Sequence, residues 1–287
     1  MRENSGFILI DKPAGISSFD VIRRLRRITG IRKIGHTGTL DPFATGLLIC
    51  ALGSYTRLCK YLEAEDKSYQ ALLKLGEETS TGDTEGEITS RDGVIPENIP
   101  LEKLTSSILS LEELPTPRYS AVKIKGKPAY AYAREGFEME LPDRPARISA
   151  FEVLSYEPPL LSYSCRVSKG TYVRSLSEFI ARGLGSIGHT VQLRRTAIGG
   201  ISVEESVTLE ELGKDNFEAR FYPPARLFEN YEQYLPGKED IAKLAQGQAV
   251  SQDGKDNQAV ILFDGDGDLF GVAKRTGGML YPLINLV

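Results

Sequence analysis

The sequence has few of the side chains that build metal centres. Its 287 residues include two histidines and three cysteines, and Cys50, Cys59 and Cys165 lie far apart in the chain. No pair of them has the spacing of a zinc or other metal motif. We therefore expect no metal, with the cysteines present as buried, reduced thiols.

Long hydrophobic runs are also missing. The chain passes from Met1 into a short strand-like segment, residues 6–10, without a basic region followed by a long apolar stretch. A secretion signal or membrane helix therefore lacks support, and we expect a cytoplasmic protein without a membrane partner. The composition, 41% hydrophobic and 26% charged, is typical of a globular protein large enough for one large domain and a small one.

Motifs for nucleotide binding, ester hydrolysis and calcium binding fail on inspection. No phosphate-binding loop ending in Gly-Lys-Ser/Thr and no Gly-x-Ser-x-Gly motif is present. Residues 183–188 match the dinucleotide string GxGxxG but follow a predicted helix instead of a strand, which favours a helix end and a turn. Residues 264–268 begin like a calcium loop, but the sixth position is Leu269 and the twelfth is Arg275, which favours a tight hairpin turn.

Charge is unevenly distributed along the chain, although the net charge is only −4. Residues 1–60 contain ten Lys/Arg and four Asp/Glu, residues 166–196 contain six and one, and residues 63–114 contain four and thirteen. A single Arg-rich helix is more often ordinary solvated surface. Two separate basic segments favour a common basic face that binds a polyanion.

Hydrophobic periodicity indicates a mixture of helices and strands. Helical spacing runs from a cap at Ser17 or Ser18 to a stop at Gly30, across residues 101–111 and around residues 176–184. Strands are predicted at residues 67–75, 119–125, 147–156, 162–168, 259–263 and 269–273.

The chain is predicted to have two domains, residues 1–228 and residues 229–287. The second segment changes to short strands and turns and contains nine acidic and five basic residues. By subtraction the first 228 residues have a formal charge of zero. We expect a large α+β domain followed by a small, acidic β domain.

The most informative segment is residues 35–48, which read GHTGTLDPFATGLL. Asp41 lies between glycines and is followed by Pro42, so its carboxylate can enter a cleft without bulky neighbours crowding a substrate. An isolated Asp-Pro is usually a turn. The complete fourteen-residue string is far less easily accidental, which makes Asp41 a candidate catalytic carboxylate.

Several separated motifs resemble the TruB family of pseudouridine synthases in their order along the chain. The loop around Asp41 resembles the family's catalytic motif, and the other matches fall mainly within the first 228 residues. They are GFILIDKPAGISS at 6–18, KSY at 67–69, TSTGDTEG at 79–86, PRYSAVK at 117–123, KGTYVRSL at 169–176 and LRRT at 193–196.

The resemblance implies the pseudouridine synthase fold, an α+β domain with a largely antiparallel sheet, followed by a small PUA-like β domain. The implied activity is isomerisation of uridine 55 in the T-loop of tRNA, without a cofactor. The segment TSTGDTEG favours the stand-alone bacterial type, so a guide RNA is not expected. We also expect the protein to be a monomer.

The same resemblance assigns roles to three residues of the reaction centre. Asp41 is the essential carboxylate, which either attacks C1′ or removes a ribose proton, and the sequence leaves both routes open. Both routes need ionised Asp41, and Arg174 is the implied cation that opposes the effect of burial on its pKa. Tyr69 stacks on the target base and assists removal of the C5 proton.

Further residues are implied to bind the RNA. His36 packs where the target base leaves the stack, and Leu193 supplies an apolar wall. Candidate phosphate contacts are Arg23, Arg26, Lys123, Arg194 and Arg195.

Two other classes of protein were weighed against the synthase. An RNA-binding protein without chemistry would not require the set Asp41, Tyr69 and Arg174. A carboxylate-dependent glycosidase normally uses a second catalytic carboxylate, and the sequence nominates none.

The segregated basic segments predict that affinity for RNA falls steeply as salt rises. Each phosphate neutralised by Lys or Arg releases counterions and contributes about −0.9 to the log-log slope for duplex, or about −0.7 for single strands. Dissociation constants measured over a salt series test this. A salt-independent constant would contradict an RNA surface built from these segments.

Overall fold

The computed structural model describes residues 5–91, 93–120, 122–124, 126–135, 137 and 141–286. Within these residues the main element is an eight-stranded sheet in the order β1-β3-β13-β4-β12-β11, with β2 paired to β3 and β14 to β13. Its pairs are antiparallel except β13 with β3, so the expected α+β class with a largely antiparallel sheet is confirmed. The strands are β1 (Gly6–Lys12), β2 (Ile34–His36), β3 (Thr45–Leu52), β4 (Lys67–Leu75), β11 (Ile148–Glu157), β12 (Leu160–Val167), β13 (Gly188–Ile198) and β14 (Ile201–Ser202).

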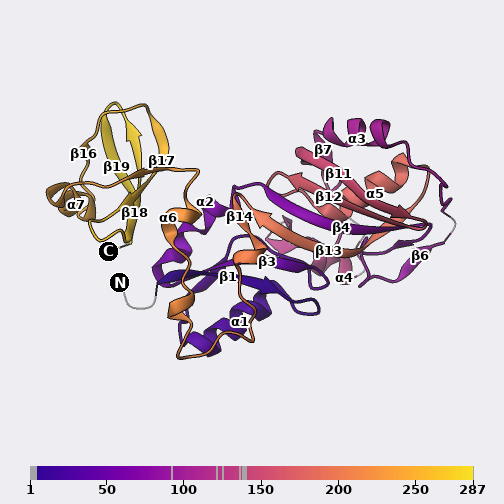
Figure 1. The fold of residues 1–287 in the computed structure, drawn as a ribbon, viewed down its shortest axis with the longest axis horizontal. Coiled ribbons are helices and arrows are strands. Elements are labelled where there is room, and N and C mark those ends of the chain that lie inside the picture. The colour runs from indigo at the N-terminus through magenta and orange to yellow at the C-terminus, as the bar shows by residue number, and fades with distance from the viewer. Residues whose placement is uncertain are drawn as a thin grey trace.

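Helices α3 (Leu101–Leu109) and α5 (Val173–Gly183) cover one face of the strands β4, β11, β12 and β13 (Figure 1). Every second residue of β4 points into the hydrophobic cluster between the helices and the sheet, as the alternation of strand side chains predicts. Tyr69, Ala71 and Leu73 are buried in this cluster. This packing leaves one end of β4, where Tyr69 lies, at the edge of the hydrophobic cluster.

Helix α1 (Ser18–Thr29) begins and ends where the sequence predicts. Ser17 and Asp20 form a capping box at its start, and Gly30 ends it with φ 73°. Val21, Ile22 and Leu25 are buried against the large sheet. Most arginines of the helix lie on its opposite face and are therefore exposed.

The turn predicted at residues 183–188 is confirmed, and the strand predicted at residues 119–125 is largely wrong. Helix α5 ends at Gly183 and β13 begins at Gly188, so residues 183–188 form a helix end and a turn. Of the strand predicted at residues 119–125, the structure has β8 (Lys123–Ile124), whereas Tyr119 and Ser120 bend, and positions 121 and 125 lie outside the described residues. The remaining short elements before residue 228 are η1 (Gly53–Leu58), α2 (Cys59–Glu63), β5 (Glu78–Thr79), β6 (Ile88–Ser90), β7 (Glu113–Leu114), β8 (Lys123–Ile124), β9 (Lys127–Pro128), α4 (Ala129–Arg134), β10 (Arg144–Pro145), η2 (Val203–Glu205), η3 (Glu218–Arg220) and α6 (Pro224–Leu227).

The C-terminal strands form a separate five-stranded sheet in the order β15-β17-β18-β19-β16. A turn at residues 264–268 joins β17 and β18, as predicted, with the amide of Gly267 donating to the carbonyl of Asp264 over 3.0 Å. One hydrophobic cluster joins the sheets through Phe7 on one side and Ile261 on the other. The elements are β15 (Glu232–Tyr234), α7 (Lys238–Ala245), β16 (Val250–Ser251), β17 (Asn257–Phe263), β18 (Leu269–Thr276) and β19 (Met279–Asn285).

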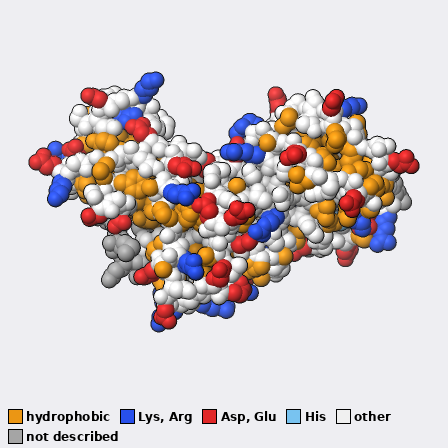
Figure 2. Space-filling model, viewed as in Figure 1, with side chains coloured by type: hydrophobic (Ala, Val, Ile, Leu, Met, Phe, Trp, Pro, Cys, Tyr) orange, Lys and Arg blue, Asp and Glu red, His pale blue; other side chains and the backbone are white. Residues whose placement is uncertain are grey.

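The surface and the cysteines agree with the composition. On the face seen in Figure 2, Lys and Arg side chains lie among Asp and Glu side chains, without one continuous basic patch. The three cysteines are buried and free, as expected. In the part of the chain that the structure describes, no helix combines the length and apolar character needed to span a bilayer.

The close contact between β3 and β13 predicts that Gly46 tolerates no side chain. A Cβ at Gly46, where φ is 105°, would lie 2.2 Å from the carbonyl oxygen of Arg195, whereas one at Gly30 would meet nothing within 4 Å. We expect Gly30→Ala to cost about 1–2 kcal/mol of unfolding free energy and Gly46→Ala about 2–5 kcal/mol. Urea unfolding of both variants measures the difference, and equal losses would contradict the contact.

Candidate active site

The loop that carries Asp41 runs from β2 to β3 and is anchored at several backbone positions. The hydroxyl of Ser18, at the start of α1, donates to the carbonyl of Leu40 over 3.1 Å and accepts from its amide over 2.8 Å. The Nε of Arg195 donates to the carbonyl of Leu47 over 2.7 Å, and its Nη2 donates to that of Gly38 over 3.0 Å. Side chains from α1 and β13 therefore fix both ends of the loop.

Lys12 supplies a further anchor that the sequence analysis did not assign. It is completely buried, and its Nζ donates to the carbonyls of Pro13, Ile16 and Pro42 over 2.9, 2.7 and 3.2 Å. Burial lowers the pKa of Lys12 to about 8, an effect that the charge of Asp41 opposes. Lys12 belongs to the sequence motif at residues 6–18, but its contact with Pro42 arises only in the folded chain.

Arg174 is the centre of the site. It is 3% exposed, and its Nε lies 3.0 Å from Oδ2 of Asp41 while its Nη1 lies 3.2 Å from Oδ2 of Asp83. Nη1 also donates to the carbonyl of Thr81 over 2.6 Å, and Nη2 donates to that of Tyr119 over 2.9 Å. Nε makes no aligned hydrogen bond, so its contact with Asp41 is an ion pair. One guanidinium thus joins three distant segments.

Burial raises the pKa of the Asp41 carboxyl above its usual range. The Arg174 guanidinium acts in the opposite direction, and the neighbouring carboxylate of Asp83 raises the pKa further. The side chain keeps 32% of its surface open to the clefts described next. Asp41 is therefore a partly desolvated carboxylate whose ionisation depends mainly on the adjacent cation Arg174, with a smaller contribution from Lys12.

Two clefts meet at Asp41. The smaller has a volume of about 360 Å³ and is lined by Tyr69, Leu193 and the segment 167–173, among others. The larger, of about 1170 Å³, extends past Phe19 toward residues 80–87. Four lining residues are shared by both clefts: His36, Thr39, Asp41 and Ser120.

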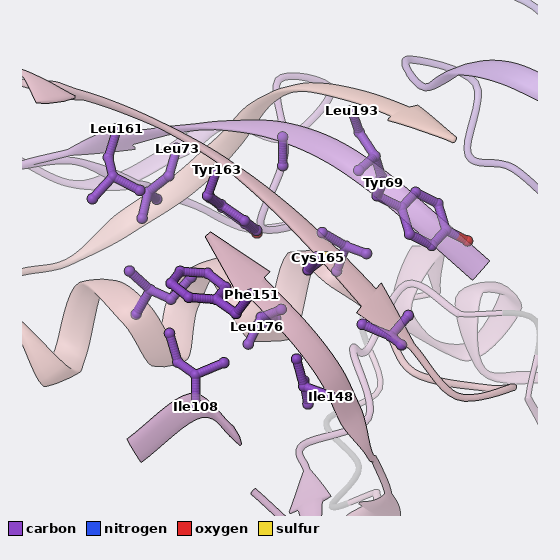
Figure 3. Packing of buried hydrophobic residues seen from close by; sticks show 14 of the residues in the cluster. Tyr69, Leu73, Ile108, Ile148, Phe151, Leu161, Tyr163, Cys165, Leu176 and Leu193 are labelled. Carbon is purple, nitrogen blue, oxygen red and sulfur yellow. The ribbon is translucent and has the colours of Figure 1, made fainter. Parts of the chain in front are cut away.

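Tyr69 and Leu193 form one wall of the smaller cleft. Figure 3 shows the two side chains next to each other at the end of the hydrophobic cluster, with the Tyr69 hydroxyl pointing away from the other labelled residues. They are 9% and 7% exposed. An aromatic ring and an apolar side chain at the mouth of a cleft suit a flat, uncharged heterocycle.

His36 lies at the end of β2, beside the junction of the two clefts. Its Nδ1 accepts a hydrogen bond of 3.3 Å from the amide of Gly38. Burial lowers the pKa of His36, and the charge of Arg195 lowers it further. The imidazole is therefore neutral at neutral pH, which suits contact with a base instead of a phosphate.

Arg194 and Arg195 point to opposite faces of the sheet, as neighbouring strand residues must. Arg195 is 1% exposed and holds backbone carbonyls, and this burial does not fit the phosphate contact predicted for it. Arg194 lines a hollow on the other face and pairs with Asp11, its Nη1 and Nη2 lying 3.0 and 2.7 Å from the carboxylate oxygens. Neither guanidinium is a free cation inside the cleft of Asp41.

The other basic candidates lie on α1 and β8. Arg23 is exposed and pairs with Asp20 on the same helix. The guanidinium of Arg26 lies 5.8 Å from the centre of the Phe19 ring, at the edge of the larger cleft. The side chain of Lys123 lies outside the residues whose side chains the structure describes. Among the described residues no group of three or more His, Cys, Asp or Glu side chains could hold a metal ion.

The fold is shared with chains of two solved complexes. The chain superposes on a chain of a Cbf5-Nop10-Gar1 complex with a TM-score of 0.72 and 22% identity, covering 98% of this chain and 85% of that one. It superposes on a chain of an H/ACA RNP bound to a substrate RNA with a TM-score of 0.70 and 22% identity, covering 98% and 85%. Likeness at this identity establishes the fold.

Sequence comparison gives the family. Residues 26–173 match the N-terminal domain of the TruB family of pseudouridylate synthases, a range that contains Asp41 and Tyr69. The tRNA pseudouridine synthase B of Burkholderia pseudomallei is 36% identical over 292 residues, covering 98% of this chain and 96% of the relative. That of Bordetella parapertussis is 44% identical over 211 residues, covering 72% and 86%. The fold and the sequence are those of a pseudouridine synthase, an isomerase, and the chain belongs to the TruB family.

The ion pair predicts how substitutions of Arg174 change the pH dependence of isomerisation. Arg174→Met leaves burial and Asp83 opposed only by the weaker effect of Lys12, so the pKa of Asp41 rises, the ionised fraction falls at a given pH and the acidic limb moves to higher pH. Arg174→Lys keeps the charge but loses the planar group. We expect rate losses of about 100-fold or more for Met and about tenfold for Lys, with little shift of the limb for Lys.

Single-turnover rates at saturating protein, measured across pH, provide this test because losses in binding do not contribute. Equal, pH-independent losses in both variants would show that Arg174 does not control the ionisation of Asp41.

Proposed function

We propose that this TruB-family pseudouridine synthase isomerises the uridine at position 55 in the T-loop of tRNA, with Asp41 as the essential carboxylate. The observation that carries the proposal is the position of Asp41, which is partly buried beside Arg174 where the two clefts meet. The relatives named tRNA pseudouridine synthase B, one of them aligned over 98% of this chain, support tRNA as the substrate.

The reaction breaks the bond between C1′ and N1, turns the base and rejoins it through C5. Asp41 acts either as the nucleophile at C1′ or as the base that removes a ribose proton, and both routes begin from the ionised carboxylate. Arg174 keeps that carboxylate ionised and oriented. The isomerisation needs no redox partner and no phosphate donor, so the proposed reaction uses no cofactor.

The smaller cleft is the proposed site of the detached base. Tyr69 stacks on the uracil and assists removal of the C5 proton. Leu193 forms part of the apolar wall against which the base turns. His36, neutral because of burial, packs where the base leaves the T-loop. A 360 Å³ space lets the base turn without leaving the protein.

The larger cleft and its surroundings are proposed to hold the rest of the T-arm. Arg23 and Arg26 on α1 are candidates for phosphate contacts beside it, together with Lys123. Arg194 could reach a phosphate only by leaving Asp11, and Arg195 is proposed to position the Asp41 loop.

We further propose that the chain acts as a cytoplasmic monomer without a guide RNA, with residues 229–287 as a separate PUA-like domain. The segment that distinguishes the stand-alone type, residues 79–86, lines the larger cleft in part and supplies two of the contacts to Arg174. Because this segment contributes directly to the site, it supports an active site that works without a guide RNA.

Asp41→Asn is expected to retain binding of tRNA but to abolish isomerisation, because the carboxylate acts in chemistry and the phosphates are held by other side chains. Unmodified tRNA transcript incubated with the variant, treated with a pseudouridine-selective carbodiimide and mapped by reverse-transcription stops gives the readout. Asp240→Asn, on helix α7 beside the C-terminal sheet, is a matched control that keeps activity. Turnover by Asp41→Asn within tenfold of that of the wild-type protein would refute the assignment of Asp41 as the essential carboxylate.

A further inference from the structure

Two buried hydroxyls in the site have no hydrogen-bond partner. The Oγ of Ser120 and the Oγ1 of Thr37 are inaccessible in the free protein and unpaired within the described residues, and the two residues are 4% and 0% exposed. Buried hydroxyls are nearly always paired in folded proteins, because an unpaired one has lost its water without compensation. An unpaired hydroxyl beside a substrate cleft therefore indicates a partner that arrives with the substrate, which it meets once the side chain changes rotamer on binding.

The clefts distinguish the two hydroxyls. Ser120 is one of the four residues that line both clefts, together with Asp41, whereas Thr37 lines only the smaller cleft with Tyr69 and Leu193. Since Asp41 must reach C1′ or its neighbour, the ribose of the target nucleotide lies at the junction. The base lies on the side of Tyr69, so Ser120 is near the sugar and Thr37 is near the base.

The position of Ser120 is tied to that of the catalytic carboxylate. The guanidinium of Arg174 donates to the carbonyl of Tyr119, the preceding residue, over 2.9 Å and lies 3.0 Å from Asp41. One rigid planar group thus holds the backbone beside Ser120 and the side chain of Asp41. A hydroxyl placed in this way can locate the sugar relative to the carboxylate.

The sugar of RNA offers a matching group. The 2′-hydroxyl is both a donor and an acceptor, and so is a serine hydroxyl. We propose that Ser120 binds the target nucleotide by a hydrogen bond between its Oγ and the 2′-hydroxyl of the ribose, a contact that selects RNA over DNA at this position. The inference rests on the proposed function, since it requires a uridine at Asp41.

A thermodynamic cycle tests the contact without depending on catalysis. In the Asp41→Asn background, dissociation constants are measured for T-arm RNAs that carry uridine or 2′-deoxyuridine at the target position. With Ser120 present, we expect the deoxy substitution to weaken binding about five- to tenfold, the size of one hydrogen bond. With Ser120→Ala the same substitution should change binding less than about twofold, and Ser120→Cys, which keeps the volume and donates weakly, should behave similarly.

Thr37→Val is the matched control, because it removes the other unpaired hydroxyl from the same site. It should leave the ratio between uridine and deoxyuridine RNAs at about five to ten, as in the parent protein. Melting temperatures of all variants report whether the fold is kept, and the Cys variant supplies the answer if the Ala variant does not fold.

The outcomes separate this inference from the function on which it rests. Equal ratios with and without Ser120, while T-arm RNA still binds, would overturn the contact and leave the proposed function standing. Loss of the ratio in Thr37→Val as well would also overturn it, since the effect would not be specific to Ser120. Failure of the Asp41→Asn protein to bind either RNA would overturn both proposals.

Discussion

The guanidinium of Arg174 is the contact on which the site depends. It lies within 3.2 Å of the carboxylates of Asp41 and Asp83 and donates to the carbonyls of Thr81 and Tyr119. A buried charge is tolerated only when its partners are well placed, and removal of one partner leaves the others uncompensated. The loop of Asp41, the segment 79–86 and the bend at Tyr119 and Ser120 are therefore held in one arrangement by a single side chain.

This arrangement conflicts with local preferences of the chain. Arg174 lies in the first turn of α5, where the helix dipole disfavours a cation, and Asp41 is desolvated, which disfavours its charge. Each group offsets the other's penalty only when both are in place. Lys12 adds a further buried charge nearby, held by backbone carbonyls. Such local conflicts are expected where function, and not stability, has selected the residues.

Features set by local chemistry could be predicted from the sequence, whereas those set by long-range contacts could not. The cap at Ser17, the stop at Gly30 and the alternation along β4 follow from neighbouring residues alone. Which of Arg194 and Arg195 turns toward the loop of Asp41 depends on which face of β13 meets the cleft, and only long-range contacts decide this. The bend at Tyr119 exists because its carbonyl is bonded to Arg174, a residue 55 positions away, and no propensity of the segment indicates it.

In the proposed function Asp41 divides the site, with the base in the smaller cleft, the ribose at the junction and the remaining RNA in the larger cleft. A crystal structure of the Asp41→Asn protein with T-arm RNA measures this directly. We expect the target uracil against Tyr69 and Leu193, with C1′ about 3–3.5 Å from the side chain at position 41. A target base that stays stacked within the T-loop, or that occupies the larger cleft, would contradict it.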